Sequence, residues 1–166
     1  MILEMHGMMP FRHPFRSCAS LERCDNSKIM RAVKFFTPVE ANQTLPLVKK
    51  IVEDIISLGK KLRSLSEEYG SSVESHPEAS KMMSQLNELF EELEDIGCSY
   101  RDWNFSTGLV DFPAMMDGTP VLLCWRSDEE KLKYYHGLQD GFAGRKPIPE
   151  QWFSEEKKAS NPGFAK

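Results

Sequence analysis

The stretch that decides the fold is GLVDFPAMMDGTPVLLCW, residues 108–125. Two runs rich in β-forming residues, LVDF and VLLCW, flank a segment that contains Asp117-Gly118, a dipeptide typical of tight hairpin turns. The sequence therefore predicts an antiparallel β-hairpin here. The preceding run CSYRDW alternates loosely and can add a third strand.

Two long amphipathic helices are expected on the N-terminal side of this hairpin. Apolar residues recur at spacings of three and four over about 46–69 and again over 78–96, where Gly97 provides a stop signal. A modest polar loop joins the two segments, so they should pack as an antiparallel helical hairpin.

The first helix has an N-terminal signal of its own. Thr37, Pro38 and Glu40 fit a capping box that begins a short helix or turn. Pro46 has no backbone N–H and should prevent a regular helix through its own position. We therefore expect the long helix to begin only at Pro46.

The segment that follows the β-hairpin is polar and then glycine-rich. SDEEKLKYYHGL predicts a short helix with Ser127 or Asp128 as its N-cap, and DGFAGRKPIP predicts a loop. The expected fold class is α+β: a long antiparallel helical hairpin packed with a C-terminal β-hairpin of two or three strands and a short helix. A single domain should span residues 35–150, followed by a polar tail over 151–166.

Residues 1–34 show no sustained period and lean towards arginine. They suit a plastid transit peptide or, on a cytoplasmic protein, a flexible basic extension or a mispredicted gene start. Residues 36–166 hold 15 basic and 22 acidic residues, which argues against a nucleic-acid partner. No apolar run reaches the roughly 18 residues of a membrane helix, so membrane insertion is not expected. The four cysteines lack zinc-finger spacing.

Asp111 and His136 are the candidate catalytic residues. Asp111 breaks an apolar strand and needs a cationic partner if it is buried. Arg145 is the natural partner, either as a structural ion pair or as part of a site. His136 follows two tyrosines and can act as a base, a ligand or a switch, or simply cap a helix end.

A divalent metal and a small ligand are the two further possibilities. Carboxylates and an imidazole for a metal would come from Glu40, Asp111, Glu129 and His136, although both glutamates also suit the first turn of a helix. Ligand contacts would come from Arg145, Gly144, Trp125 and Tyr135, the two aromatics being equally suited to core packing. Cys124 is expected to be a buried, inert thiol.

Three motifs resemble those of an uncharacterised family of small proteins from bacteria and plants, domain-of-unknown-function family 2203. They are FTPVEAN…LP, GLVDFPA…DG…VLLCW and E…YYH…GFAGRKPI, and the resemblance covers about residues 36–149. Asp128 and Tyr135 depart from the family pattern, which usually has Gly and Trp there. The resemblance implies no activity. The basic arm lies outside it and would suit a protein imported into a plastid.

Three functions remain open from the sequence. The first is a binding or interaction module with a polar pocket near the C-terminal motif and no catalysis of its own. The second is a metal-assisted or acid–base enzyme that uses Asp111, His136 and a glutamate. The third is self-association through the helical hairpin. An enzyme requires those side chains to converge in an accessible concave site, whereas a protein-binding surface does not.

Overall fold

The computed structural model describes residues 34–154. The expected transit peptide and nearly all of the expected polar tail lie outside the described residues. Within them, no helix combines the length and the apolar character needed to cross a membrane.

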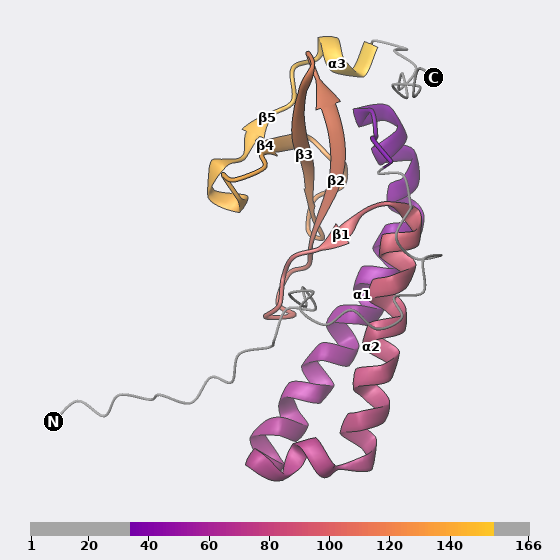
Figure 1. The fold of residues 1–166 in the computed structure, drawn as a ribbon, viewed down its shortest axis with the longest axis vertical. Helices are drawn as coiled ribbons and strands as arrows, with labels where there is room; N and C mark the ends of the chain where they lie inside the picture. The colour runs from indigo at the N-terminus through magenta and orange to yellow at the C-terminus, as the bar shows by residue number, and fades with distance from the viewer. Residues whose placement is uncertain (1–33, 155–166) are drawn as a thin grey trace, which may run out of the picture. The chain divides into compact units, whose positions relative to one another are not determined.

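A helical hairpin forms the first half of the described chain, as predicted (Figure 1). Helix α1 spans Pro38–Tyr69, the 3₁₀ helix η1 spans Gly70–Ser75, and α2 spans Pro77–Ile96. The capping box is confirmed: the Thr37 hydroxyl accepts from the Glu40 N–H at 3.2 Å, and the Glu40 carboxylate accepts from the Thr37 N–H at 2.8 Å. Helix α2 ends at Gly97, whose φ of 104° is left-handed.

Helix α1 runs through Pro46 without interruption, so the expectation of a break there is wrong. Proline removes one i→i−4 hydrogen bond and crowds the preceding turn, which is unfavourable but local. Leu45 and Val48, on either side of it, are both buried in the core. Continuous packing of this apolar stripe outweighs the lost bond.

Five antiparallel strands follow in the order in which they occur along the chain. They are β1 (Ser99–Tyr100), β2 (Leu109–Met116), β3 (Thr119–Arg126), β4 (Tyr134–Gly137) and β5 (Lys146–Pro147). The predicted hairpin is confirmed as β2–β3, with left-handed φ values of 50° at Asp117 and 75° at Gly118. The 3₁₀ helix η2 (Phe142–Gly144) lies between β4 and β5.

The helix expected over residues 127–138 is wrong, because this segment turns and then forms β4. Strand β4 pairs with the far side of β3. The turn is fastened to α1 by Asn42, whose side-chain amide accepts from the Leu132 N–H at 2.9 Å and donates to the Leu132 carbonyl at 3.1 Å. Pairing with β3 and the bonds to Asn42 outweigh the helical tendency of the charged residues at the start of this segment.

The folded part extends past the boundary expected at residue 150. A short helix, α3 (Gln151–Ser154), follows β5. Its Trp152 ring packs edge-on against Tyr135, with centroids 5.1 Å apart. Residues 151–154 are therefore part of the fold.

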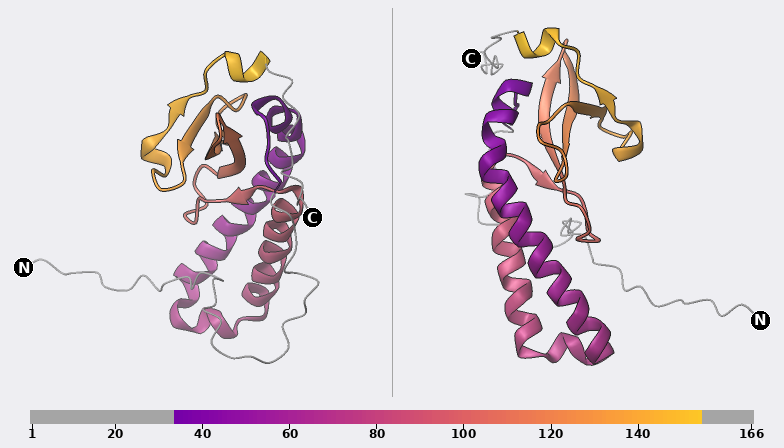
Figure 2. Two further views of the ribbon diagram at one scale, coloured as in Figure 1. Left: turned by 45° about the horizontal axis from the view of Figure 1, so that its top comes forward. Right: turned by 180° about the vertical axis from the view of Figure 1, so that it is seen from behind.

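The two faces of the sheet have different surroundings. Val110, Phe112, Leu123 and Trp125 belong to one core that also includes the apolar stripes of α1 and α2, and the N-terminal half of α1 runs along this face (Figure 2). We call this the inner face. The intervening residues of β2 and β3 point to the opposite, outer face, because side chains alternate along a strand.

A close approach fixes the loop that leads into β2 against α1. A Cβ placed on Gly59 of α1 would lie 2.2 Å from Cγ of Phe105, so the ring rests directly on the helix backbone. Phe105 is buried, which leaves its ring little freedom to move, and its backbone has a left-handed φ of 53°.

We predict that Gly59→Ala destabilises the protein by about 1–3 kcal/mol, because the added methyl group overpacks the Phe105 ring. In most helix interiors the same change is favourable by up to about 1 kcal/mol. Urea unfolding followed by tryptophan fluorescence measures the difference. Ser57→Ala, at an exposed position of the same helix, should be neutral or slightly stabilising. A Gly59→Ala protein as stable as the wild type would contradict this contact.

Candidate functional site

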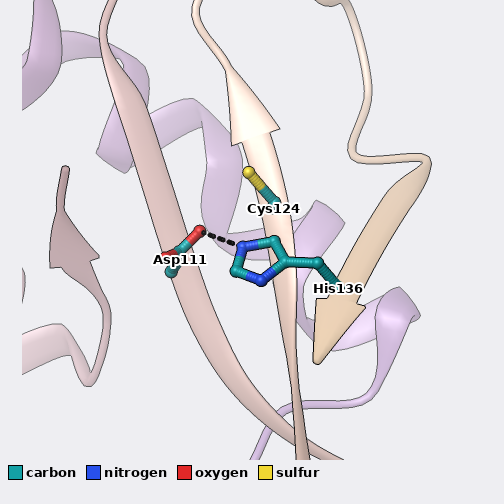
Figure 3. Close-up of side chains that lie close together, drawn as sticks. All are labelled: Asp111, Cys124 and His136. Atoms are coloured by element: carbon teal, nitrogen blue, oxygen red, sulfur yellow. Dashed lines mark hydrogen bonds and ion pairs between the residues drawn. The ribbon is translucent and has the colours of Figure 1, made fainter. Parts of the chain in front are cut away.

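Three buried polar side chains meet on the outer face of the sheet (Figure 3). Asp111 comes from β2, Cys124 from β3 and His136 from β4. The register places Asp111 directly opposite Cys124, and His136 opposite Leu122, two residues along β3. One carboxylate oxygen, the thiol sulfur and one imidazole nitrogen lie within 4.8 Å of one another. This group, Asp111–Cys124–His136, is called the triad cluster below.

Two side-chain nitrogens lie against the Asp111 carboxylate. Its Oδ1 lies 3.3 Å from His136 Nε2, and its Oδ2 accepts a hydrogen bond of 3.1 Å from Arg101 Nε. The Asp111 side chain is only 6% exposed, so its carboxylate needs polar partners inside the protein. The expected Asp111–Arg145 pair is wrong, since Arg101, which follows β1, takes that position.

The second ring nitrogen of His136 has a fixed role. Nδ1 lies 2.8 Å from the Gly137 carbonyl oxygen, which can only accept a hydrogen bond. Nδ1 therefore carries a proton and donates to Gly137. This bond orients the ring so that Nε2 faces Asp111 and the interior of the triad cluster.

Cys124 is a buried free cysteine, as expected. Burial raises the pKa of its thiol to about 12, and the negative charge of Asp111 acts in the same direction. The thiol is therefore protonated at neutral pH unless a cation comes close to it.

A cavity of about 340 Å³ opens over the triad cluster. This volume lies within the range of small-molecule sites. Beyond the three cluster residues its lining includes Arg101, Leu109, Leu122, Leu138, Gln139 and Phe142. The floor is thus polar and buried, and most of the wall is apolar.

Arg145 forms a separate ion pair beside this cavity. One of its terminal nitrogens donates to both carboxylate oxygens of Glu129, at 2.8 and 2.7 Å, and to the Cys124 carbonyl at 3.1 Å. Its guanidinium also lies over the rings of Tyr134 and Phe142, 4.3 and 4.9 Å from their centroids. These contacts tie the segment after β4 back to β3.

The structure does not bring the other candidate residues into the triad cluster. Glu40 caps α1, and Glu129 is held by Arg145. Trp125 is buried in the core, and Tyr135 packs on Trp152. Gly144 allows a close approach to Asp140, whose Cβ would lie 2.4 Å from a Cβ at residue 144. Of the expected residues, only Asp111 and His136 belong to the triad cluster.

Arg101 and Cys124 are the members of the site that the sequence interpretation missed. Cys124 had a signal: it lies six residues after Gly118, and Asp111 lies six residues before Asp117, so the two-residue turn makes them direct partners. Arg101 had no such signal, because its position depends on how the loop after β1 folds.

Asp102 shapes that loop. The nearly buried carboxylate accepts backbone hydrogen bonds from Asn104, Ser106, Thr107 and Gly108 at 2.7–3.1 Å. Burial raises the pKa of Asp102, but the four N–H donors outweigh that effect and hold the pKa below its ordinary value of 3.8. The ionised side chain therefore organises the turn between Arg101 and β2.

Comparison with known protein families gives a match that covers most of the described residues. A protein-family model described as "Uncharacterized conserved protein (DUF2203)" matches residues 34–148. No curated protein and no solved structure gives a significant match to the chain.

We predict that Asp102→Asn is less stable than the wild type at pH 7. The difference in unfolding temperature between the two proteins should narrow below about pH 4. The pKa of Asp102 is lower in the folded than in the unfolded chain. Its ionised form therefore stabilises the fold above the unfolded pKa, and this contribution is lost as the pH falls through the folded pKa. Thermal unfolding between pH 2.5 and 7 tests this. Asp54→Asn, at an exposed position of α1, is the control and should give a small, pH-independent change.

We also predict that Glu129→Gln destabilises the protein by about 2–3 kcal/mol, because it leaves the Arg145 guanidinium largely buried without its counter-charge. The Arg145 side chain is 10% exposed in this pair. Asp128→Asn breaks the exposed Arg126–Asp128 pair in the same turn and should have little effect. Urea unfolding measures the free energy of unfolding of both variants. Equal losses would contradict the prediction that the buried Arg145–Glu129 pair stabilises the protein more than the exposed pair.

Proposed function

The chain belongs to the uncharacterised conserved family that its residues 34–148 match, and because that family brings no activity with it, we propose from the pocket alone that this protein binds a small molecule on the outer face of its sheet. One observation carries the proposal: three buried polar side chains from three strands converge beneath a cavity of about 340 Å³. Buried polar groups that converge under an apolar rim are the usual mark of a ligand site.

The lining indicates the chemistry of the ligand. Leu109, Leu122, Leu138 and Phe142 offer contact area to a small apolar body. Arg101 supplies positive charge: its side chain is 52% exposed and only its Nε is bonded to Asp111, so the terminal nitrogens are without partners among residues 34–154. A guanidinium with free terminal N–H groups favours a carboxylate or a similar anion. The ligand is therefore a small anion with an apolar portion.

A second hollow, between α1 and α2, is the comparison site. Its volume is about 400 Å³, and its lining includes Asp54, Lys61, Glu88 and Glu92 around Leu58 and Leu89. Its charged residues are exposed and solvated. This hollow lacks the buried polar floor of the outer-face cavity, and it suits the interaction or self-association hypothesis rather than small-molecule recognition.

Catalysis is the second candidate function. It is favoured by the position of the His136–Asp111 pair, which lines the cavity directly. An imidazole beside a carboxylate is a common acid–base pair. Either function requires a small molecule to bind in this cavity, so the first experiment addresses binding.

We predict that benzoate shifts backbone amide NMR signals of β2, β3 and β4 around the cavity, and that benzamide, its neutral analogue, does so much more weakly. Arg101→Gln should weaken benzoate binding by about tenfold, the loss of one charge-assisted hydrogen bond. Lys61→Gln, which removes a positive charge from the helical hollow, should leave it unchanged. Shifts confined to residues 54–61 and 85–92, or no shifts at all, would contradict the proposal.

A further inference from the structure

The orientation of His136 leaves an electrostatic conflict inside the triad cluster. Because Nδ1 donates to the Gly137 carbonyl, Nε2 of the neutral ring carries a lone pair. That lone pair faces Asp111 Oδ1 at 3.3 Å, and two lone pairs at this distance repel each other. Either a proton or a metal cation must lie between them.

Metal-binding histidines show this same arrangement of the second nitrogen. They donate their free N–H to a carbonyl or carboxylate, which fixes the tautomer and aims the other nitrogen at the ion. We propose that Asp111, Cys124 and His136 are three protein ligands of one divalent transition-metal ion, and that the fourth coordination position faces the outer-face cavity.

The ligand types favour zinc. Zinc accepts carboxylate oxygen, thiolate sulfur and imidazole nitrogen, and sites with three protein ligands keep an open position for water or substrate. One carboxylate and one thiolate cancel the two positive charges, so the buried site is neutral when the ion is bound. The ion displaces the Cys124 proton, which leaves to solvent.

The geometry of the triad cluster is close to that of a tetrahedral site. Bonds of about 2.0–2.3 Å at tetrahedral angles place ligand atoms about 3.3–3.6 Å apart. The Asp111 Oδ1 to His136 Nε2 separation is already 3.3 Å, and no pair of ligand atoms exceeds 4.8 Å. Rotation of the side chains can bring the ligand atoms this much closer together. The backbones need not move, because the three residues lie on neighbouring strands.

Arg101 adds a feature expected around a metal ligand. It binds Asp111 Oδ2 and leaves Oδ1 to face the cluster, so the carboxylate is oriented by its second oxygen. Ligating carboxylates are commonly held in this way. The fourth ligand would be water or the anionic group of the bound molecule, and in this last respect the inference rests on the proposed function.

The competing explanation is a metal-free ion pair between an imidazolium and Asp111. In that case Cys124 is a protonated thiol beside Asp111 and not a metal ligand. Cys98 provides the matched comparison, because it is also buried and free, and burial likewise raises its pKa to about 12. Its thiol donates to the Leu93 carbonyl at 3.4 Å, and it belongs to no cluster of metal-ligating groups within the described part of the chain.

The test uses the full chain with Cys18 and Cys24 changed to serine, so that two cysteines remain. After treatment with EDTA the protein is titrated with Co²⁺, which reports thiolate ligation by a charge-transfer band in the near ultraviolet. We expect one equivalent to bind and to produce this band. Cys124→Ser should abolish the band and Cys98→Ser should keep it. Asp111→Asn and His136→Gln should each weaken binding at least tenfold.

Absorption spectroscopy at the zinc edge gives a second result that needs no variant at the site. The zinc-loaded protein should show one sulfur and otherwise oxygen or nitrogen neighbours. Absence of stoichiometric metal, a site without sulfur, or a band that survives Cys124→Ser would overturn the inference.

The benzoate experiment, repeated on EDTA-treated and zinc-loaded protein, separates the two proposals. Zinc binding with the Cys124-dependent band but without benzoate shifts leaves the metal site standing and removes the proposed ligand function. The opposite outcome is a protein that binds no metal but shows the same benzoate shifts whether or not zinc is added. It leaves the ligand function standing and removes the metal site.

Discussion

The outer face of the sheet is organised by one constraint, the need to neutralise the carboxylate of Asp111. Asp111 is 4% exposed, and an ionised carboxylate in that setting is costly unless it is paired and hydrogen-bonded. The groups around it come from both sides of the β2–β3 hairpin: Arg101, after β1, donates to Oδ2, and His136 of β4 faces Oδ1 across the position of a proton or a metal cation. The polar floor of the cavity is therefore a consequence of satisfying this one buried charge.

Because side chains alternate along a strand, β2 and β3 place core residues on one face of the sheet and the polar cluster on the other. The inner-face residues of β2 and β3 pack with the helices into one core, which includes Phe112 and Trp125. Their neighbours in sequence, Asp111 and Cys124, point the other way and share the outer face. A shift of one residue in register would exchange the two sets. The tight turn at Asp117-Gly118 fixes that register, so it determines where the polar side chains lie.

Local signals in the sequence located the central hairpin and both helices, except that α1 continues through Pro46. The capping box at Thr37, the stop at Gly97 and the Asp117-Gly118 turn each act within a few residues. Strand β4 was missed because its identity depends on pairing with β3, while its own neighbourhood is charged and resembles a helix. The partner of Asp111 was missed for the same reason. Arg101 and Arg145 have the same charge, and only the folded loops decide which one is near.

The partners of Arg101 and Arg145 also determine which of the two guanidinium groups is open to a ligand. Arg145 is bonded to both oxygens of Glu129 and stacked on two rings, so its charge is neutralised and its position is fixed. Arg101 shares only its Nε with Asp111 and is half-exposed at the edge of the cavity. Under the proposed function, selection of an anion therefore depends on Arg101, which the sequence did not single out, and Arg145 of the GFAGR motif instead holds the wall of the pocket in place.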